Sequence, residues 1–319
     1  MLISETNSPP LVAQARGSAR RLQQWLTLVM VIAPVLGVVL AIIMLWGRGV
    51  DGLDVMLLVG MYVATVLGVE VGLHRHFSHR AFQTFPWMRA GLGVFGSMAA
   101  QGPVLFWASV HRRHHAYSDR EGDPHSPRAQ GAGWRGRLRG LWHGHLGWLF
   151  QFEVTDLAAY APDLLRDRLV FNLSYLYPIW VLLGLLLPAV LGGVISGSWV
   201  GAATGCLWGG LVRVFLVHHA TWSVNSLCHT FGSRPFRTRD QSTNNPWLML
   251  SSLGGSWHNN HHAFPHAALN SLRWWQLDPS GWLIQLLRAV GLVWDVRVAD
   301  WRPSGFQAAQ SLAKGDQMG

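Results

Sequence analysis

Cysteine is almost absent from this chain: only Cys206 and Cys228 occur among its 319 residues. The two stand too far apart for a CxxC or zinc-ribbon motif, so the sequence indicates neither a disulfide framework nor a thiolate metal site. Charged residues are also scarce, at 13% of the chain. Half of all residues are hydrophobic and 18 are tryptophan, which excludes an ordinary soluble domain and indicates an integral membrane protein.

Acidic residues are the rarer of the two charge types, with 16 Asp and Glu against 25 Lys and Arg, a formal net charge of +9. Such a balance can indicate a nucleic-acid partner, but the arginines flank apolar segments and no recognition motif accompanies them. We therefore expect no nucleic-acid binding. The positive charge is expected to face anionic membrane lipid on the cytoplasmic side.

Four long apolar segments predict membrane-spanning helices, at residues 25–46, 53–73, 170–195 and 198–220. Each is long enough to cross roughly 30 Å of hydrocarbon. The uncharged segment 90–110 has similar hydropathy, but its Gly102-Pro103 pair disfavours one continuous helix. A crossing there would also put the histidines before and after it on opposite faces of the membrane. We therefore expect a re-entrant or interface-lying hairpin at 90–110.

The arginine-rich stretch 111–169 is expected to be cytoplasmic by the positive-inside rule, and four spans then leave both termini cytoplasmic. Residues 1–24 are predicted to form a disordered arm and 303–319 a disordered tail, around one membrane domain at 25–302. The predicted fold is all-α: a polytopic membrane protein with four transmembrane helices and a cytoplasmic helical cap.

Histidine is abundant and grouped, and the spacing of the groups indicates a metal centre. On a helix, residues at i, i+3 and i+4 share one face, and neutral imidazole suits Zn, Cu, Fe and Ni. The candidates exceed what one ion can bind, so two metals are predicted in the cap. The candidate ligands are His74, His79, His111, His114, His115, His229, His258, His261 and His262, and Asn225 lies one helical turn before His229.

The spacings HxxxxH at 74–79 and HxxHH at 111–115 and 258–262 resemble the three histidine boxes of membrane fatty acyl desaturases. The sequence around the boxes resembles the delta-9, stearoyl-type branch of that family. The resemblance extends from about residue 50 to 300. It is carried by Gln101-Gly102-Pro103, Trp107, Asp123-Pro124-His125, His145-Leu146-Gly147-Trp148, the stretch 220–226 and Trp257.

The resemblance implies that the nine histidines hold two Fe ions as a di-iron centre, with Asn225 as a water-mediated neighbour. No catalytic side chain is expected beyond the metal ligands. Asp123 and His125 are candidates for orienting the ligands, the alternative being that they only close a turn before Pro127. The implied reaction is O2-dependent introduction of a cis double bond, delta-9, into a fatty acyl chain.

The chain also departs from the animal acyl-CoA enzymes of that family. Ser109-Val110 stand where those enzymes carry charge, and residues 150–153 replace a basic pair, so the acyl carrier stays open between CoA, acyl carrier protein and lipid. The Gln-Gly-Pro element resembles bacterial and cyanobacterial enzymes, which predicts a bacterial inner membrane. The family's acidic residue before the third box is replaced by Gly254-Gly255-Ser256. No cytochrome domain is fused, so electrons are expected from a separate ferredoxin or reductase.

Two other functions are consistent with the histidine groups. A related membrane di-iron hydroxylase would leave oxygen on its product, and a non-catalytic metal-binding membrane protein would consume no O2. Arg112 and Arg113 are expected to contact phosphates, of an acyl carrier or more commonly of lipids. The remaining histidines are expected to be hydrogen-bonded core residues outside the metal centre, namely His143, His218, His219 and His266, with His76 in a supporting or surface position.

Overall fold

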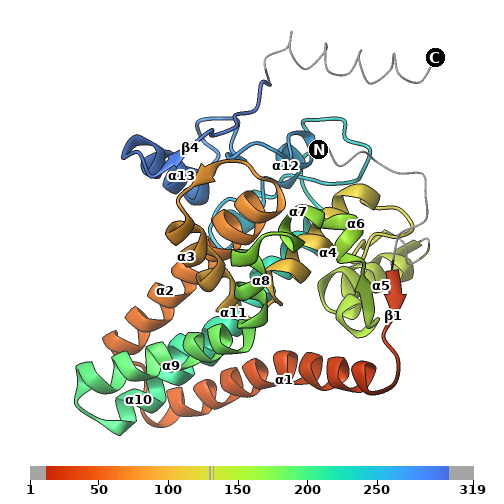
Figure 1. Ribbon diagram of the computed structural model, residues 1–319. Helices are drawn as coiled ribbons and strands as arrows, with labels where there is room; N and C mark the ends of the chain where they lie inside the picture. Colours follow the sequence, from red (N-terminus) through yellow and green to blue (C-terminus); the bar gives the residue numbers. More distant parts are fainter. Residues whose placement is uncertain (1–11, 129–130, 132, 302–319) are drawn as a thin grey trace, which may run out of the picture.

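The computed structural model describes residues 12–128, 131 and 133–301. It has four helices long and apolar enough to cross a membrane, and these form an elongated stem beneath a cap (Figure 1). The first is α1 (Gly17–Gly47). The second is α2 (Gly52–Leu67), which continues as the π-helix η1 (Gly68–Ser78). The third is α9 (Tyr177–Ser196), and the fourth combines α10 (Trp199–Gly205), η3 (Cys206–Val212) and α11 (Arg213–Leu227).

The number of spans agrees with the prediction, whereas several boundaries differ. Helix α1 begins at Gly17, and Val12–Gln14 form strand β1, paired antiparallel with β3 (Glu153–Thr155), so the predicted disorder is wrong for residues 12–24. The third span begins at Tyr177 because Pro178 favours a new helix start there. The predicted arm's residues 1–11 and the tail at 303–319 lie outside the described residues.

The segment 90–110 does not cross the membrane as one helix. Helix α3 (Pro86–Ser97) ends before Gly102-Pro103, and α4 (Val104–Tyr117) begins after that pair. Gly102 has a φ of 104°, a conformation that side-chain-bearing residues rarely adopt. Among the described residues this segment is not one of the four candidate spans, so the predicted break in it is confirmed, while its re-entrant or interfacial placement stays a prediction.

The cap consists of short helices and strands at one end of the spans, opposite the turn between α1 and α2 (Figure 1). Strand β2 (Gln83–Thr84) pairs with β4 (Val293–Trp294). The remaining elements are α5 (Gly133–His145), η2 (Gly147–Phe150), α6 (Leu157–Tyr160), α7 (Pro162–Leu165), α8 (Arg168–Tyr175), η4 (Pro246–Leu248), α12 (His258–Ala263) and α13 (Pro279–Ala289).

An apolar core holds η1 against α4 and therefore fixes the first histidine group relative to the second. Burial of such side chains contributes about 1.5–3 kcal/mol each. The core also contains residues of α8 and α11, so the cap and the fourth span share it. Its fully buried members include Leu73 and Phe77 of η1, Val104 and Ala108 of α4, Val170 of α8 and Val217 of α11.

Arg213 is fully buried in the fourth span and faces the bundle interior. Its guanidinium donates hydrogen bonds to the carbonyls of Met98 (2.6 Å), Gly184 (2.6 Å) and Gly209 (3.1 Å). Pro188 has no N–H to donate to the Gly184 carbonyl one turn earlier in α9, so Arg213 supplies the missing donor. This side chain ties α9 and the end of α3 to the fourth span.

The exposed aromatic residues mark the stem's far end. Trp46 and Trp199 are 89% and 92% exposed and lie beside the two turns farthest from the cap, as expected for an interfacial belt. On α1 and α9, large apolar side chains such as Leu36 and Leu186 are also exposed, which suits contact with lipid.

The turn between α1 and α2 lies at the far end of the stem from α5, α12 and α13 (Figure 1). We therefore expect Val50, in that turn, to face the opposite side of the membrane from Leu138 of α5 and Trp274, which lies between α12 and α13. We expect Val50→Cys to react with a membrane-impermeant maleimide from one side of oriented vesicles, and Leu138→Cys and Trp274→Cys from the other. Native Cys228 is fully buried and Cys206 lies within a span, so labelling of the wild-type chain should be low and measures the background reaction. Labelling of all three positions from one side would contradict the four-span fold.

Candidate metal centre

Four segments bring the predicted histidines together at the cap end of the spans. They are η1, α4, the turn after α11 and α12, and each carries at least one of the nine side chains. The chain separates the first and last of these by 187 residues, as in the contact between His74 and His261. Tertiary packing, and not local sequence alone, therefore assembles the centre.

The π-helical geometry of η1 explains the HxxxxH spacing. The backbone N–H of His79 donates to the carbonyl of His74, five residues earlier, at 3.1 Å. In a helix with i→i+5 hydrogen bonds, residue i+5 lies nearly above residue i, whereas in an α-helix it would turn away. Both imidazoles consequently point to the same side, with ring centroids 5.0 Å apart.

One group of imidazoles, here called site A, comprises His74, His79, His111, His115 and His261. The Nε2 atom of His111 lies 2.7 Å from that of His79 and 3.1 Å from that of His115. The Nε2 atom of His261 lies 3.0 Å from that of His115 and 3.1 Å from that of His74. Four of them, His74, His79, His111 and His261, lie close enough to hold one ion, and His115 joins them through its contacts with His111 and His261.

The second group, site B, comprises His114, His229, His258 and His262, which all lie close enough to hold one ion. The Nε2 atom of His258 is 2.9 Å from that of His229 and 3.0 Å from that of His262. The Nε2 atoms of His114 and His262 are 3.4 Å apart. Sites A and B together contain all nine predicted ligands.

Each HxxHH motif divides its histidines between the two sites, and the two motifs do so in opposite ways. In α4 the i and i+4 residues, His111 and His115, belong to site A, and the i+3 residue belongs to site B. In α12 the i and i+4 residues, His258 and His262, belong to site B, and the i+3 residue, His261, belongs to site A. The sites are therefore neighbours that share both helices.

The spacing of the nitrogens agrees with metal coordination. Imidazole nitrogens bind a transition metal at about 2.0–2.1 Å, so two ligands at angles between 90° and 109° lie about 2.9–3.4 Å apart. The observed Nε2 separations run from 2.7 Å to 3.4 Å. The donor set in both sites is nitrogen throughout, which suits borderline metals such as Fe or Zn.

Carboxylates contact the other ring nitrogen of three site B ligands. The Nδ1 atoms lie 2.9 Å from Asp123 in His114, 2.8 Å from Asp119 in His229 and 2.8 Å from Asp240 in His262. Carboxylate–histidine–metal arrangements of this kind fix the imidazole orientation and its tautomer. Because each Nδ1–H donates to a carboxylate, each neutral ring presents a bare Nε2 lone pair to site B.

These lone pairs cannot satisfy one another by hydrogen bonding. A hydrogen bond needs a proton between two nitrogens, yet the Nε2 atoms of His114 and His262 are both acceptors when their Nδ1 atoms donate. His258 is the one site B imidazole whose Nδ1 is buried without a partner, and it could offer a single N–H. A cation bound by the four nitrogens satisfies all the lone pairs at once.

Burial keeps most of the ligand imidazoles neutral. Desolvation lowers the pKa of His79, His111, His115, His258 and His261 well below the ordinary value, and neighbouring imidazoles lower it further. The neutral ring is the form that binds metal. At neutral pH these side chains are therefore ready to coordinate without losing a proton.

Asp119 and Asp240 were not among the predicted site residues. Burial would raise the pKa of both carboxylates, but His229 beside Asp119 and His262 beside Asp240 hold each pKa below its ordinary value. Asp119 has a φ of 59° and also accepts from the Gln241 N–H at 2.6 Å. No spacing rule relates these acids to histidines 110 and 22 residues away, so they could not be found from the sequence.

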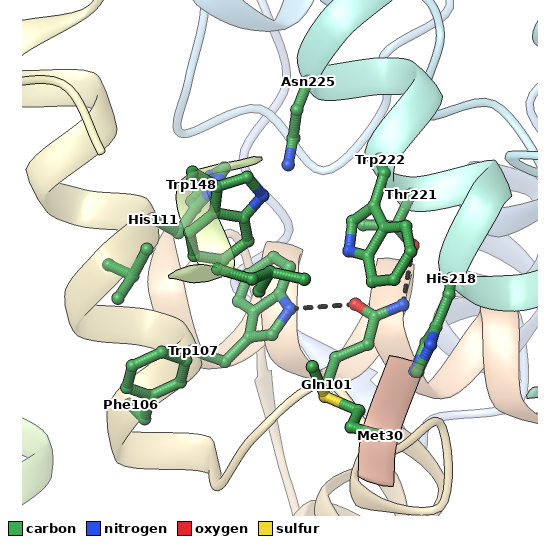
Figure 2. Close-up of a pocket in the computed structure, with 12 residues that line it drawn as sticks. Met30, Gln101, Phe106, Trp107, His111, Trp148, His218, Thr221, Trp222 and Asn225 are labelled. Atoms are coloured by element: carbon green, nitrogen blue, oxygen red, sulfur yellow. Dashed lines mark hydrogen bonds between the residues drawn. The ribbon is translucent and has the colours of Figure 1, made fainter. Parts of the chain in front are cut away.

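The structure supports both interpretations of Asp123. Its carboxylate accepts from His114, and it also accepts the backbone N–H groups of Asp119 (2.9 Å) and His125 (3.1 Å), which closes the turn. His125 packs its ring against His114 with centroids 4.4 Å apart. Asn225 lies in a cavity beside His111 (Figure 2).

The other histidines make protein hydrogen bonds outside the two sites. The Nε2 atom of His218 lies 3.0 Å from the carbonyls of both Ala99 and Ala100. His219 bonds to His145 at 2.9 Å, and His76 and His266 contact the carbonyls of Phe82 and His79. The predicted role as a hydrogen-bonded core residue is confirmed for His218, which is buried, whereas His219 and His266 are hydrogen-bonded but only half-buried.

Arg112 and Arg113 do not face phosphates, so that expectation is wrong. Both are buried: Arg113 pairs with Glu153, and Arg112 donates to the carbonyls of Phe77 and Ser78, each at 2.8 Å. Arg112 also pairs with Asp163. Burial would raise the pKa of Asp163, but Arg112 and Arg80 outweigh it and lower that pKa to about 2.

A cavity of about 50 Å³ lies against site A. Its walls are largely aromatic, with Trp107, Trp148 and Trp222 around His111 (Figure 2). Gln101 spans the cavity wall, because its amide donates to Thr221 at 2.9 Å and accepts from the Trp107 indole at 3.2 Å. An apolar cavity with few fixed polar groups suits an apolar ligand placed beside the metal-binding side chains.

Because each HxxHH motif supplies ligands to both sites, replacing one of its histidines should remove the ion from the one site to which that histidine belongs. We expect His261→Ala to lose site A metal and His114→Ala to lose site B metal, so that purified protein binds about half of the wild-type metal. His219→Ala, a half-buried histidine outside both sites, should retain all of it. Metal analysis by mass spectrometry measures the outcome, and full metal content in either ligand variant would contradict the assignment.

The carboxylate pairs predict a selective effect on site B. Replacing Asp119, Asp123 or Asp240 by Ala should weaken metal binding at site B about 10–100-fold, since each change frees an imidazole that the carboxylate orients. Site A should be unaffected. Asp156→Ala, which removes an exposed acid that caps α6, serves as the control. Equal weakening of both sites would show that the effect is on folding alone.

Comparison with known proteins places this geometry in a family. The fatty acid desaturase model matches residues 53–292. The hex-5-enoyl-[acyl-carrier protein] acetylenase of Moorena producens is 48% identical over 84% of this chain and 84% of that protein. The sn-1 stearoyl-lipid 9-desaturase of Anabaena variabilis is 36% identical over 73% of this chain and 80% of that protein.

The corresponding sn-1 stearoyl-lipid 9-desaturase of Synechocystis is 35% identical over 75% of this chain and 70% of that protein. The matched region contains three of the four candidate spans and every histidine of sites A and B. The chain therefore belongs to the fatty acid desaturase family, whose members are oxidoreductases acting on fatty acyl chains.

Proposed function

We propose that this protein introduces a cis double bond, in the delta-9 position, into a fatty acyl chain by means of a di-iron centre in sites A and B. The position of the aromatic cavity carries this proposal: it touches His111 of site A and Asn225. The part of an acyl chain that enters this cavity would have its methylenes beside the metal-binding nitrogens. Two of the relatives named above are described as 9-desaturases.

The nine histidines would hold the two iron ions, and the lowered pKa of buried rings such as His79 and His258 suits this role. When bound, iron supplies O2-dependent oxidation, which unactivated methylenes require because no protein side chain can attack them. The protein's own contribution is positional. The three cavity tryptophans would exclude water and orient one carbon pair, and Asn225 would hold a water beside the centre.

The acyl carrier is proposed to be an acyl carrier protein or a glycerolipid. Ser109 is fully buried and donates to the Phe106 carbonyl, so the position that is charged in animal acyl-CoA enzymes is unable to contact CoA here. The relatives include one enzyme named for an acyl-carrier-protein substrate and others named for lipid substrates. Electrons are proposed to come from a separate ferredoxin or reductase.

The proposed location is the bacterial inner membrane, with the cap and both termini cytoplasmic. Residues 25–302 are proposed to be one domain, because core residues of η1, α4, α8 and α11 pack together. A second candidate reaction is conversion of an alkene into an alkyne, favoured by the 48% identity to an acetylenase. Hydroxylation is the third outcome that product analysis can distinguish.

A bacterial host unable to make unsaturated fatty acids tests the proposal directly. We expect expression of the chain, with a ferredoxin system, to restore growth and to yield a delta-9 alkene located by mass spectrometry. Separate analysis of the lipid, acyl-carrier-protein and CoA pools identifies the carrier. His114→Ala is the matched inactive control. A hydroxylated or acetylenic product would show that the protein catalyses one of the alternative reactions instead. The absence of any oxidised product would refute the proposed reaction.

A further inference from the structure

Glu70 of η1 places a carboxylate beside His74 of site A. It lies in η1, four residues before His74, and its Oε2 atom is 3.3 Å from the Nδ1 atom of that histidine. The same oxygen is 3.9 Å from the guanidinium of Arg75. The Glu70 side chain is only 12% exposed, so these neighbours and not solvent surround most of it.

The segment before α12 leaves space for this carboxylate because it has no side chain there. A Cβ atom added at Gly255 would lie 2.4 Å from the Oε1 atom of Glu70, which is closer than real Cβ contacts occur. Gly254 makes similar room for Asp278, where an added Cβ would lie 2.2 Å from Oδ1. A side chain at 255 would therefore displace the Glu70 carboxylate from its observed position.

A second ion pair secures Arg75 beside this carboxylate. Arg75 is fully buried and donates to both carboxylate oxygens of Asp278, at 2.7 Å and 3.0 Å. Asp278 in turn accepts the N–H of Gly281 and thereby caps α13. The guanidinium is consequently fixed beside the Glu70 carboxylate.

The two metal sites differ in how their imidazoles are oriented. Site B has three carboxylate partners, whereas the buried Nδ1 atoms of His79 and His261 in site A have no partner in the described part of the chain. Glu70 is the carboxylate that contacts a site A ligand. It holds the proton of His74 on Nδ1 and so directs the Nε2 lone pair towards His261.

We propose that Glu70 is the positioning residue of site A, and that it replaces the acid absent at Gly254-Gly255-Ser256 by occupying that space from η1. The two positions are complementary: η1 carries the carboxylate, and glycine at 255 leaves the space that it occupies. This inference rests on the proposed metal centre and adds to it the residue that sets the His74 tautomer.

Metal titration of the metal-free, full-length protein in detergent tests this inference, with Co²⁺ as the probe and its absorption as the signal. Wild-type protein should bind two equivalents. In Glu70→Ala the second equivalent should bind about 10–100-fold more weakly while the first is unchanged. Gly255→Glu alone should also impair site A, because two carboxylates cannot share the space. Glu153→Ala, which removes an acid paired with Arg113, is the matched control.

The decisive variant is Glu70→Ala combined with Gly255→Glu, which returns the carboxylate to the segment before α12. We expect it to bind the second equivalent at least tenfold more tightly than either single variant. Glu70→Gln keeps the shape and should show a smaller loss, since a neutral amide accepts a weaker hydrogen bond. Thermal unfolding of each metal-free variant checks that the fold is retained.

The outcomes separate the two proposals. Wild-type protein that binds no Co²⁺ would refute the metal centre itself. Wild-type protein that binds two equivalents, with Glu70→Ala or Glu70→Gln unchanged from it, would overturn only the role of Glu70. Failure of the double variant to exceed the single variants, at equal thermal stability, would likewise overturn the proposed exchange.

Discussion

The mutual repulsion of imidazole lone pairs is the constraint on which this structure depends. Nine buried histidines point their Nε2 atoms at two centres with separations as short as 2.7 Å, and carboxylates hold the protons of several of them on the opposite nitrogen. Such an arrangement is costly unless a cation binds the lone pairs. The rest of the cap consists of elements that prevent these rings from turning apart: the shared core, the buried ion pairs and the carboxylate contacts.

The helix types follow from the same constraint. Five-residue spacing in the first box requires the π-helix η1, which also extends the second span to Ser78, whereas i, i+3 and i+4 spacing suits the α-helices of the other two boxes. Because i+3 and i+4 positions point in slightly different directions, one helix can serve two adjacent ions. In α4 the i+3 histidine belongs to site B, and in α12 it belongs to site A, so each helix supplies ligands to both sites.

Features carried by local pattern could be predicted from the sequence, and features set by tertiary contact could not. Apolar length gave the four spans, and the Gly102-Pro103 pair gave the break between α3 and α4. The three boxes gave the ligand candidates that sites A and B bring together. Asp240 was missed because only the folded chain places it against His262, and the order at Val12–Gln14 because it depends on pairing with β3.

Glu70 shows why the absence of a family residue is weak evidence for the absence of its role. The sequence lacks an acid at Gly254-Gly255-Ser256, which viewed alone would leave that side of the centre without a carboxylate. In the fold, Gly255 lies against Glu70, and the two positions are separated in the chain but occupy one space. A metal ligand responds to the charge and hydrogen bond that reach it, whichever segment supplies them. What matters for the ligand is therefore the position of the carboxylate in space, and η1 can provide it as well as the segment before α12.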